Sequence, residues 1–117
     1  MPEDLKVDSV RSVNTDKLGR TLNSARANHF VIDSSSGPAE AVTSGEAFLA
    51  GISSCGVNVV TSAARQRAVP LTRAEVEIDG VRSAQNTADF LRIDVRFSMD
   101  GPTTAQANEL VQHWQSV

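Results

Sequence analysis

Cys55 is the only cysteine of the chain and the residue best suited to covalent chemistry. A thiolate is a nucleophile, and it forms most readily beside a cation. Burial alone disfavours the thiolate, so a reactive Cys55 requires a cation from elsewhere in the fold. A lone cysteine on an apolar helix face is more often a small hydrophobic residue, and both interpretations stay open at this point. One cysteine cannot form an internal disulfide, which agrees with a reducing compartment, and we therefore expect a cytoplasmic protein.

Metal and nucleotide chemistry are less favoured by the sequence. His29 and His113 could join Cys55 as metal donors, but the three residues lack the short ligand spacing of zinc sites. We interpret the histidines as surface or capping residues and predict no metal and no cofactor. The sequence also lacks a glycine-rich phosphate loop, a nucleophile elbow and a dinucleotide-binding fingerprint.

The segment that carries Cys55 is predicted to be a buried helix from Ser44 to about Arg67. Thr43 and Glu46 have the spacing of a capping box, and Pro70 lies just beyond the expected end. Apolar side chains recur on one face of this helix, and others make the remaining faces apolar as well. The first set is Phe48, Ile52, Cys55 and Val59, and the second is Leu49, Val57 and Val60.

Alternating apolar and polar residues predict strands on both sides of this helix. Before it, we expect one strand over residues 5–14 and one or two strands over residues 20–33. After it, we expect two half-exposed antiparallel strands over residues 73–81 and 91–99, with acidic side chains on one opposite arginines on the other.

A second amphipathic helix is expected to close the chain, after the break at Gly101 and Pro102. Thr103 and Gln106 repeat the capping-box spacing there. The order of strands, buried helix, strands and amphipathic helix, with short connections, predicts an α+β fold with antiparallel sheets.

Composition limits the remaining function classes. The 117 residues suggest a single domain, and the apolar fraction of 40% with 21% charged residues is typical of a globular protein. A formal charge of −3, from 11 basic and 14 acidic residues, argues against nucleic acid as a partner. We expect no membrane span, because no apolar run approaches about 20 residues. The start of the chain, residues 1–4, lacks the pattern of a signal peptide.

The segment SGEAFLAGISSC, from Ser44 to Cys55, resembles the central helix of the OsmC/Ohr family, the osmotically induced and organic-hydroperoxide-resistance proteins. In that family a proline and a glutamate are followed by small and apolar residues and then by the reactive cysteine. Ser44 replaces the proline here, and both residues suit a helix start. The segment from His29 to Asp33 is similar to the preceding strand of the family, and with the order of elements the resemblance covers nearly the whole chain.

This resemblance implies a thiol-dependent peroxidase that reduces organic hydroperoxides and defends against oxidative stress. Cys55 would be the peroxidatic cysteine, and Glu46 would be the orienting carboxylate. Nine residues of helix put these two side chains about 13.5 Å apart on opposite faces, so Glu46 would orient an arginine or act on a partner's thiol. The thiolate-stabilising arginine would be Arg26, which we prefer because it is nearer the segment from His29 to Asp33, or Arg20; a solvent-exposed strand arginine is an equally good interpretation of each.

One departure from the family pattern affects the mechanism. The family's resolving cysteine lies near the terminal helix, close to Gln115 here, and this chain has no second cysteine. An external dithiol would then have to supply the reducing equivalents. Family members also tend to be longer, so the single domain over residues 1–117 either lacks a C-terminal segment that is usual in the family or has no resolving cysteine at all. The alternative is a non-catalytic OsmC-like domain that binds a small apolar ligand or has a structural role.

The long helix also predicts a homodimer, on physical grounds and from the family. A helix that is apolar on several faces cannot be covered fully by a few short strands and one further helix. Ala50, Gly51 and Gly56 thin its middle and would admit a second backbone. We expect a twofold, intertwined pair of central helices that buries more than about 2,000 Å² and brings each Cys55 near groups of the other subunit.

Overall fold

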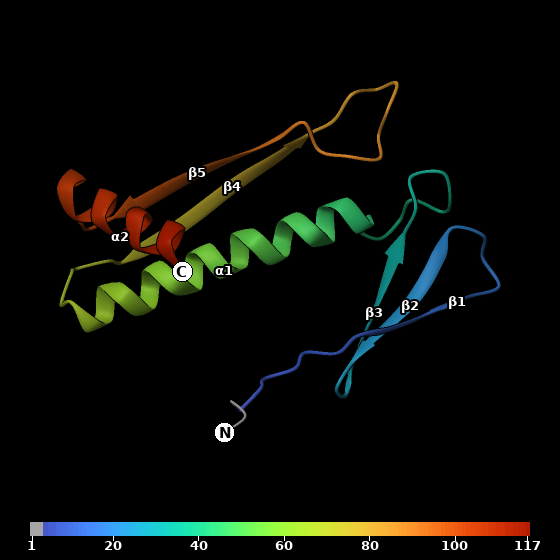
Figure 1. Ribbon diagram of the computed structural model, residues 1–117, viewed down its shortest axis with the longest axis horizontal. Coiled ribbons are helices and arrows are strands. Elements are labelled where there is room, and N and C mark those ends of the chain that lie inside the picture. Colours follow the sequence, from blue (N-terminus) through green and yellow to red (C-terminus); the bar gives the residue numbers. More distant parts are fainter. Residues whose placement is uncertain (1–3) are drawn as a thin grey trace. The chain divides into compact units, whose positions relative to one another are not determined.

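The computed structural model describes residues 4–117, which form five strands and two helices in the order β1, β2, β3, α1, β4, β5 and α2 (Figure 1). Both sheets are antiparallel, so the predicted α+β class is confirmed. The chain divides into two units, residues 1–47 and 48–117, which are described in turn. The expectation about a signal peptide concerns residues 1–3 in part, and these lie outside the described residues.

The first unit contains a three-stranded meander of β1 (Arg11–Asn14), β2 (Arg20–Ala25) and β3 (Asn28–Asp33). The predicted strand over residues 5–14 is wrong in its first half. Arg11 pairs with Ser24, and β2 turns away at Arg26, so earlier residues have no partner strand there. The segment over residues 20–33 forms two strands joined by a two-residue turn, the second of the two predicted alternatives.

Helix α1 (Ser44–Gln66) begins at the predicted capping box. The Glu46 amide donates to Thr43 Oγ1 at 3.1 Å, and the Thr43 amide donates to Glu46 Oε1 at 2.9 Å. Both bonds satisfy amides that the first helical turn leaves without a partner. The helix ends one residue before the predicted Arg67.

The second unit builds its core between α1, α2 (Thr104–Ser116) and the hairpin of β4 (Arg73–Val81) and β5 (Arg92–Asp100), whose long strands run beside α1 in Figure 1. Strand β5 begins one residue later than predicted. Its Arg96 contacts Glu77 at 3.4 Å and Asp79 at 3.0 Å, as the opposite charges predict. Thr103 caps α2 in a capping box with Gln106. The fully buried cluster consists of Val60, Ala63, Ala64 and Leu110.

Only one face of α1 is buried in this chain, which agrees with the expectation that a few strands and one further helix cannot cover it fully; burial of its other faces by a second subunit stays a prediction. The buried positions are Gly56, Val60, Ala63 and Ala64, because two strands and one helix cover one side alone. At Gly56 an added Cβ would lie 3.2 Å from the Phe97 ring, whereas at Gly51 it would meet nothing within 4 Å. Within the chain, the Phe97 ring therefore packs closely against Gly56, whereas no group packs against Gly51.

The length and composition of α1 also correct the expectation that no segment is long and apolar enough to span a membrane. Its 23 residues include an 18-residue window with a mean hydropathy of 1.4, enough by length and composition to cross a membrane. Core helices of soluble proteins meet the same criterion, so this is weak evidence for a membrane span.

Candidate functional site

The Cys55 thiol lies in the middle of α1 on its exposed face. Phe48, Gly51 and Cys55 are three and four residues apart, which places them in one row along the helix. Phe48 keeps 55% of its surface exposed, and Gly51 has no side chain. A small molecule can therefore reach the sulfur along an apolar row.

Glu46 does not share the face of Cys55. Its carboxylate is engaged at the helix start, where it accepts the hydrogen bond from Thr43. Nine residues of continuous helix separate it from the cysteine by about 13.5 Å and half a turn. Within one subunit the Glu46 side chain thus has a capping role, as the helix geometry already required.

Arg20 is held rigidly at the start of β2. Its Nε and Nη2 donate to the two carboxylate oxygens of Asp33 at 2.7 and 2.8 Å, and Nη2 also donates to Glu40 at 3.1 Å. Asp33 is fully buried and accepts two further bonds, from the Glu40 and Ala41 amides. These bonds lower the pKa of Asp33 well below its usual range, with the Arg20 guanidinium as the largest cause, and the same pairing raises the pKa of Arg20.

Arg26 lies at the other end of β2, in the turn that leads to β3. It is exposed and has a φ of 57°, a backbone conformation that favours glycine. Six residues of strand separate the Arg20 and Arg26 backbones by roughly 20 Å, so the two side chains start from opposite ends of β2.

The residues that orient Arg20 were not predicted from the sequence. Asp33 is its cross-strand partner in the register of β2 and β3, and Glu40 follows seven residues later. The signal was the acidic residue that ends the apolar run from Phe30 to Ile32. The acidic residue identifies the partner of Arg20 only when the pairing register of β2 and β3 is known, and the turn at Arg26 sets that register.

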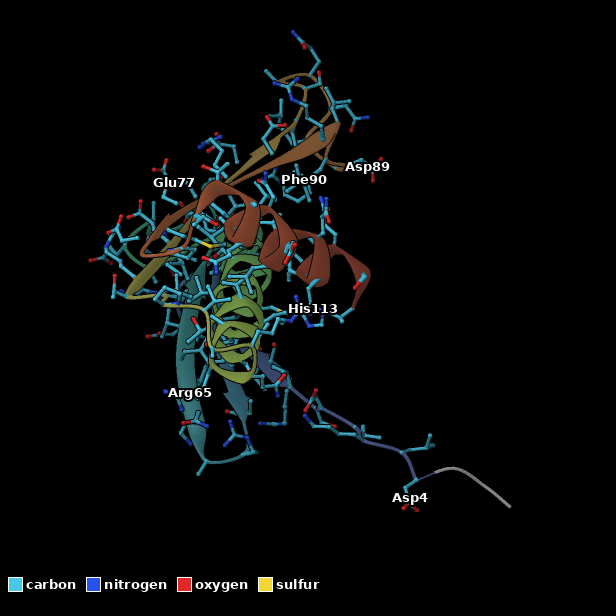
Figure 2. The ribbon with its side chains drawn as sticks, turned by 90° about the vertical axis from the view of Figure 1, so that its left-hand side faces the viewer. Asp4, Arg65, Glu77, Asp89, Phe90 and His113 are labelled. Atoms are coloured by element: carbon cyan, nitrogen blue, oxygen red, sulfur yellow. The ribbon has the colours of Figure 1, made fainter. Side chains whose placement is uncertain are left out.

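Neither histidine takes part in a metal cluster among residues 4–117, where no group of three or more suitable donors was found. His29 Nδ1 lies 2.8 Å from the Ser24 hydroxyl. His113 lines a cavity of about 390 Å³ together with Asn58 and Gln66, and it extends from α2 in Figure 2. A second cavity, of about 540 Å³, lies between β5 and α2 and is lined by Phe97 and Trp114, among others.

The fold and the cysteine define an α+β protein with an exposed thiol on its longest helix. The family model described as OsmC-like protein matches residues 37–117, more than half of the chain. The chain therefore belongs to the OsmC-like protein family, and the predicted resemblance is confirmed.

Solved structures have the same fold. An OsmC-like protein from Mycoplasma pneumoniae gives a TM-score of 0.84 at 14% identity, covering 95% of this chain and 82% of that chain. A Legionella pneumophila protein described as an organic hydroperoxide resistance protein OsmC gives 0.74 at 14% identity, with 97% and 85% covered. The organic hydroperoxide resistance protein OhrB of Bacillus subtilis gives 0.65 at 15% identity, with 97% and 86% covered. No curated protein matches the sequence significantly.

Proposed function

We propose that this protein is a thiol-dependent peroxidase that reduces organic hydroperoxides through Cys55. The observation that carries the proposal is the exposed thiol in the middle of α1, reached along the apolar row from Phe48. Membership of the OsmC-like family and the names of two structural neighbours, both organic hydroperoxide resistance proteins, support it.

The reaction transfers one oxygen atom. The Cys55 thiolate attacks the terminal oxygen of the hydroperoxide, the O–O bond breaks, and the products are a sulfenic acid and an alkoxide, which takes a proton to become the alcohol. A thiol then displaces the hydroxyl as water and forms a mixed disulfide with Cys55. The second thiol of the same reductant then attacks the mixed disulfide and releases Cys55 as a thiol. The reductant leaves as an internal disulfide, so the peroxide is reduced and the dithiol is oxidised.

An external dithiol is proposed because one cysteine cannot close an internal disulfide. Arg20 and Arg26 are the candidates for stabilising the thiolate. We favour Arg20, because its guanidinium is already held in one orientation. The Asp33 carboxylate fixes its orientation, and fixed groups contribute most to catalysis. We further propose a homodimer in the cytoplasm, since the exposed face of α1 is apolar and its Gly51 leaves room for a second backbone.

The second candidate is a non-catalytic OsmC-like domain. It is favoured by the single cysteine and by the two carboxylates that already neutralise Arg20. Such a domain would bind a small apolar ligand, for which the cavity of about 540 Å³ beside Trp114 is large enough, or would have a structural role.

A peroxidase assay with cumene hydroperoxide and dithiothreitol separates the two candidates. We expect turnover in the wild type, none in Cys55→Ser, and nearly full activity in the neighbouring Ser54→Ala control. Trapping with a sulfenic-acid reagent, followed by mass spectrometry, should label Cys55 after one equivalent of peroxide. Turnover that survives in Cys55→Ser, or a wild type with neither turnover nor labelling, would refute the peroxidase.

A further inference from the structure

Among residues 4–117, the alternating segment that precedes β1 has no partner strand. Leu5 and Val7 keep 82% and 75% of their surface exposed, although the alternation of apolar and charged residues from Asp4 to Asp8 is typical of a half-buried strand. Figure 2 shows this segment extended, with Asp4 near its outer end. We call residues 4–8 the arm. Its pattern is that of a strand whose partner lies outside the subunit.

Strand β5 has a free edge with an apolar groove beside it. In the described part of the chain its sheet contains β4 and β5 alone, so β5 is paired on one side only. Ile93 and Val95 are half-buried and line the cavity of about 540 Å³ together with Trp114 of α2. An edge strand beside such a groove can accept a further strand, which pairs with the edge through its backbone and places alternate side chains in the groove.

The arm and the first half of β5 have complementary sequences. The arm reads DLKVD over residues 4–8, and β5 reads RIDVR over residues 92–96. When Lys6 lies opposite Asp94, each acidic end of the arm faces an arginine and the apolar residues meet at the groove. The charges match in either strand direction, because each segment is symmetric about its central residue. Opposite charges that face each other across two strands stabilise the pairing.

The ion pairs that β5 already makes leave this edge available. Arg92 contacts Asp94 at 3.0 Å, and Arg96 contacts two carboxylates of β4 at 3.0 and 3.4 Å. The side chains of all these pairs are exposed, and exposed pairs contribute little to stability. They can therefore rearrange toward an added strand at a small cost.

We propose that the arm pairs as a strand with residues 92–96 of β5 in a second copy of the chain. Leu5 and Val7 enter the groove beside Trp114, and the charged residues of the arm lie on the solvent side of the sheet. Within one chain both the arm and the groove are uncovered, so a second copy is the partner that carries the complementary sequence.

The inference rests on the proposed homodimer, to which it adds a contact apart from the exposed face of α1. In a twofold pair the exchange is reciprocal, so the contact occurs twice. An arm seated in the groove also excludes the small apolar ligand of the second candidate function.

Disulfide crosslinking between two single-cysteine variants tests the contact. In a Cys55→Ser background, one variant carries Lys6→Cys and the other carries Asp94→Cys, so only contact between copies can join the two thiols. We expect a crosslinked pair after mixing and oxidation, because facing Cα atoms of adjacent strands lie about 5 Å apart, within the range of a disulfide. Ser98→Cys is the matched control. It lies four residues, about 13 Å, further along the same face of β5 and should crosslink to Lys6→Cys at least roughly tenfold more slowly.

Charge reversal provides the second measurement. Lys6→Glu faces Asp94 with a like charge at two symmetric contacts, and it should raise the Kd of the dimer about tenfold in sedimentation. Adding Asp94→Lys to Lys6→Glu should restore the wild-type Kd. Lys17→Glu, the same change at the other lysine of the chain, which is also exposed, should leave the Kd unchanged.

Equal crosslinking at positions 94 and 98, or a dimer that Lys6→Glu does not weaken, would overturn the contact. The proposed homodimer would stand in either case, whereas a well-folded monomer at micromolar concentration would refute both. A disulfide that closes within one chain of a Lys6→Cys, Asp94→Cys double variant would assign the groove to the chain's own arm and overturn the role of the second copy.

Discussion

Arg20 and Asp33 face each other across β2 and β3, and two hydrogen bonds of 2.7 and 2.8 Å join the guanidinium to the buried carboxylate. Because Asp33 also accepts the Glu40 and Ala41 amides, it ties the end of the meander to the segment that leads into α1. Removing Arg20 leaves the buried Asp33 carboxylate without its counter-ion, and removing the Asp33 charge leaves Arg20 with the exposed Glu40 alone, so either change costs more than loss of an exposed pair would.

Asp33→Asn should therefore destabilise the protein, and the midpoint of thermal unfolding should fall by roughly 5 °C or more. The amide keeps the size of the side chain but loses the charge and one acceptor. Glu40→Gln is the matched control, since Glu40 is 74% exposed and contributes a weak surface pair. Equal melting temperatures of Asp33→Asn and the wild type would contradict this role.

Stability should also depend on pH in a way that Asp33 controls. Its pKa is lowered in the folded state, so its contribution is present above the unfolded carboxyl value of about 4 and is lost as the pH falls toward the folded value. Urea unfolding between pH 7 and pH 2.5 should show the wild type losing stability below about pH 4. Asp33→Asn should lose less over the same interval, and parallel curves would be the contrary result.

Arg20 and Arg26 can be separated by substitutions that suit their backbones. Arg26→Gly removes a guanidinium and relieves the positive φ, so the fold should be retained or slightly stabilised. Arg20→Lys keeps a charge but loses the bidentate pairing with Asp33. We expect peroxidase kcat/KM to fall at least tenfold in Arg20→Lys and to change less than twofold in Arg26→Gly. The reverse pattern would assign the role to Arg26.

The cap of α1 allows the structural and chemical roles of Glu46 to be distinguished. Thr43→Ala removes the Oγ1 acceptor and should cost about 1 kcal/mol of stability. Glu46→Gln keeps an acceptor for the Thr43 amide, so stability should change little. A large loss of peroxidase activity in Glu46→Gln would show that the charge matters for catalysis. Unchanged kinetics would leave Glu46 as a capping residue alone.

The two glycines of α1 test the homodimer. Gly56→Leu should unfold or strongly destabilise the chain, because even a Cβ added there would lie 3.2 Å from the Phe97 ring. Gly51→Leu meets open space within the subunit, and we expect it to weaken dimerisation, and folding to the extent that the fold depends on the dimer. Sedimentation of the wild type as a well-folded monomer at micromolar concentration would exclude the dimer.

The sequence by itself determined the elements that local chemistry specifies. Both capping boxes, the alternating strands after α1 and the amphipathic α2 depend on residues within a few positions of one another, so spacing was enough to place them. Cys55 on the long helix and the family resemblance came from the same local pattern. Tertiary structure decided the strand register and the buried face of α1, because both depend on which distant segments of the chain come into contact. The pairing register made β1 begin at Arg11 and set Asp33 against Arg20. Packing against the β4–β5 hairpin decided which face of α1 is buried and which face, with Cys55, is exposed.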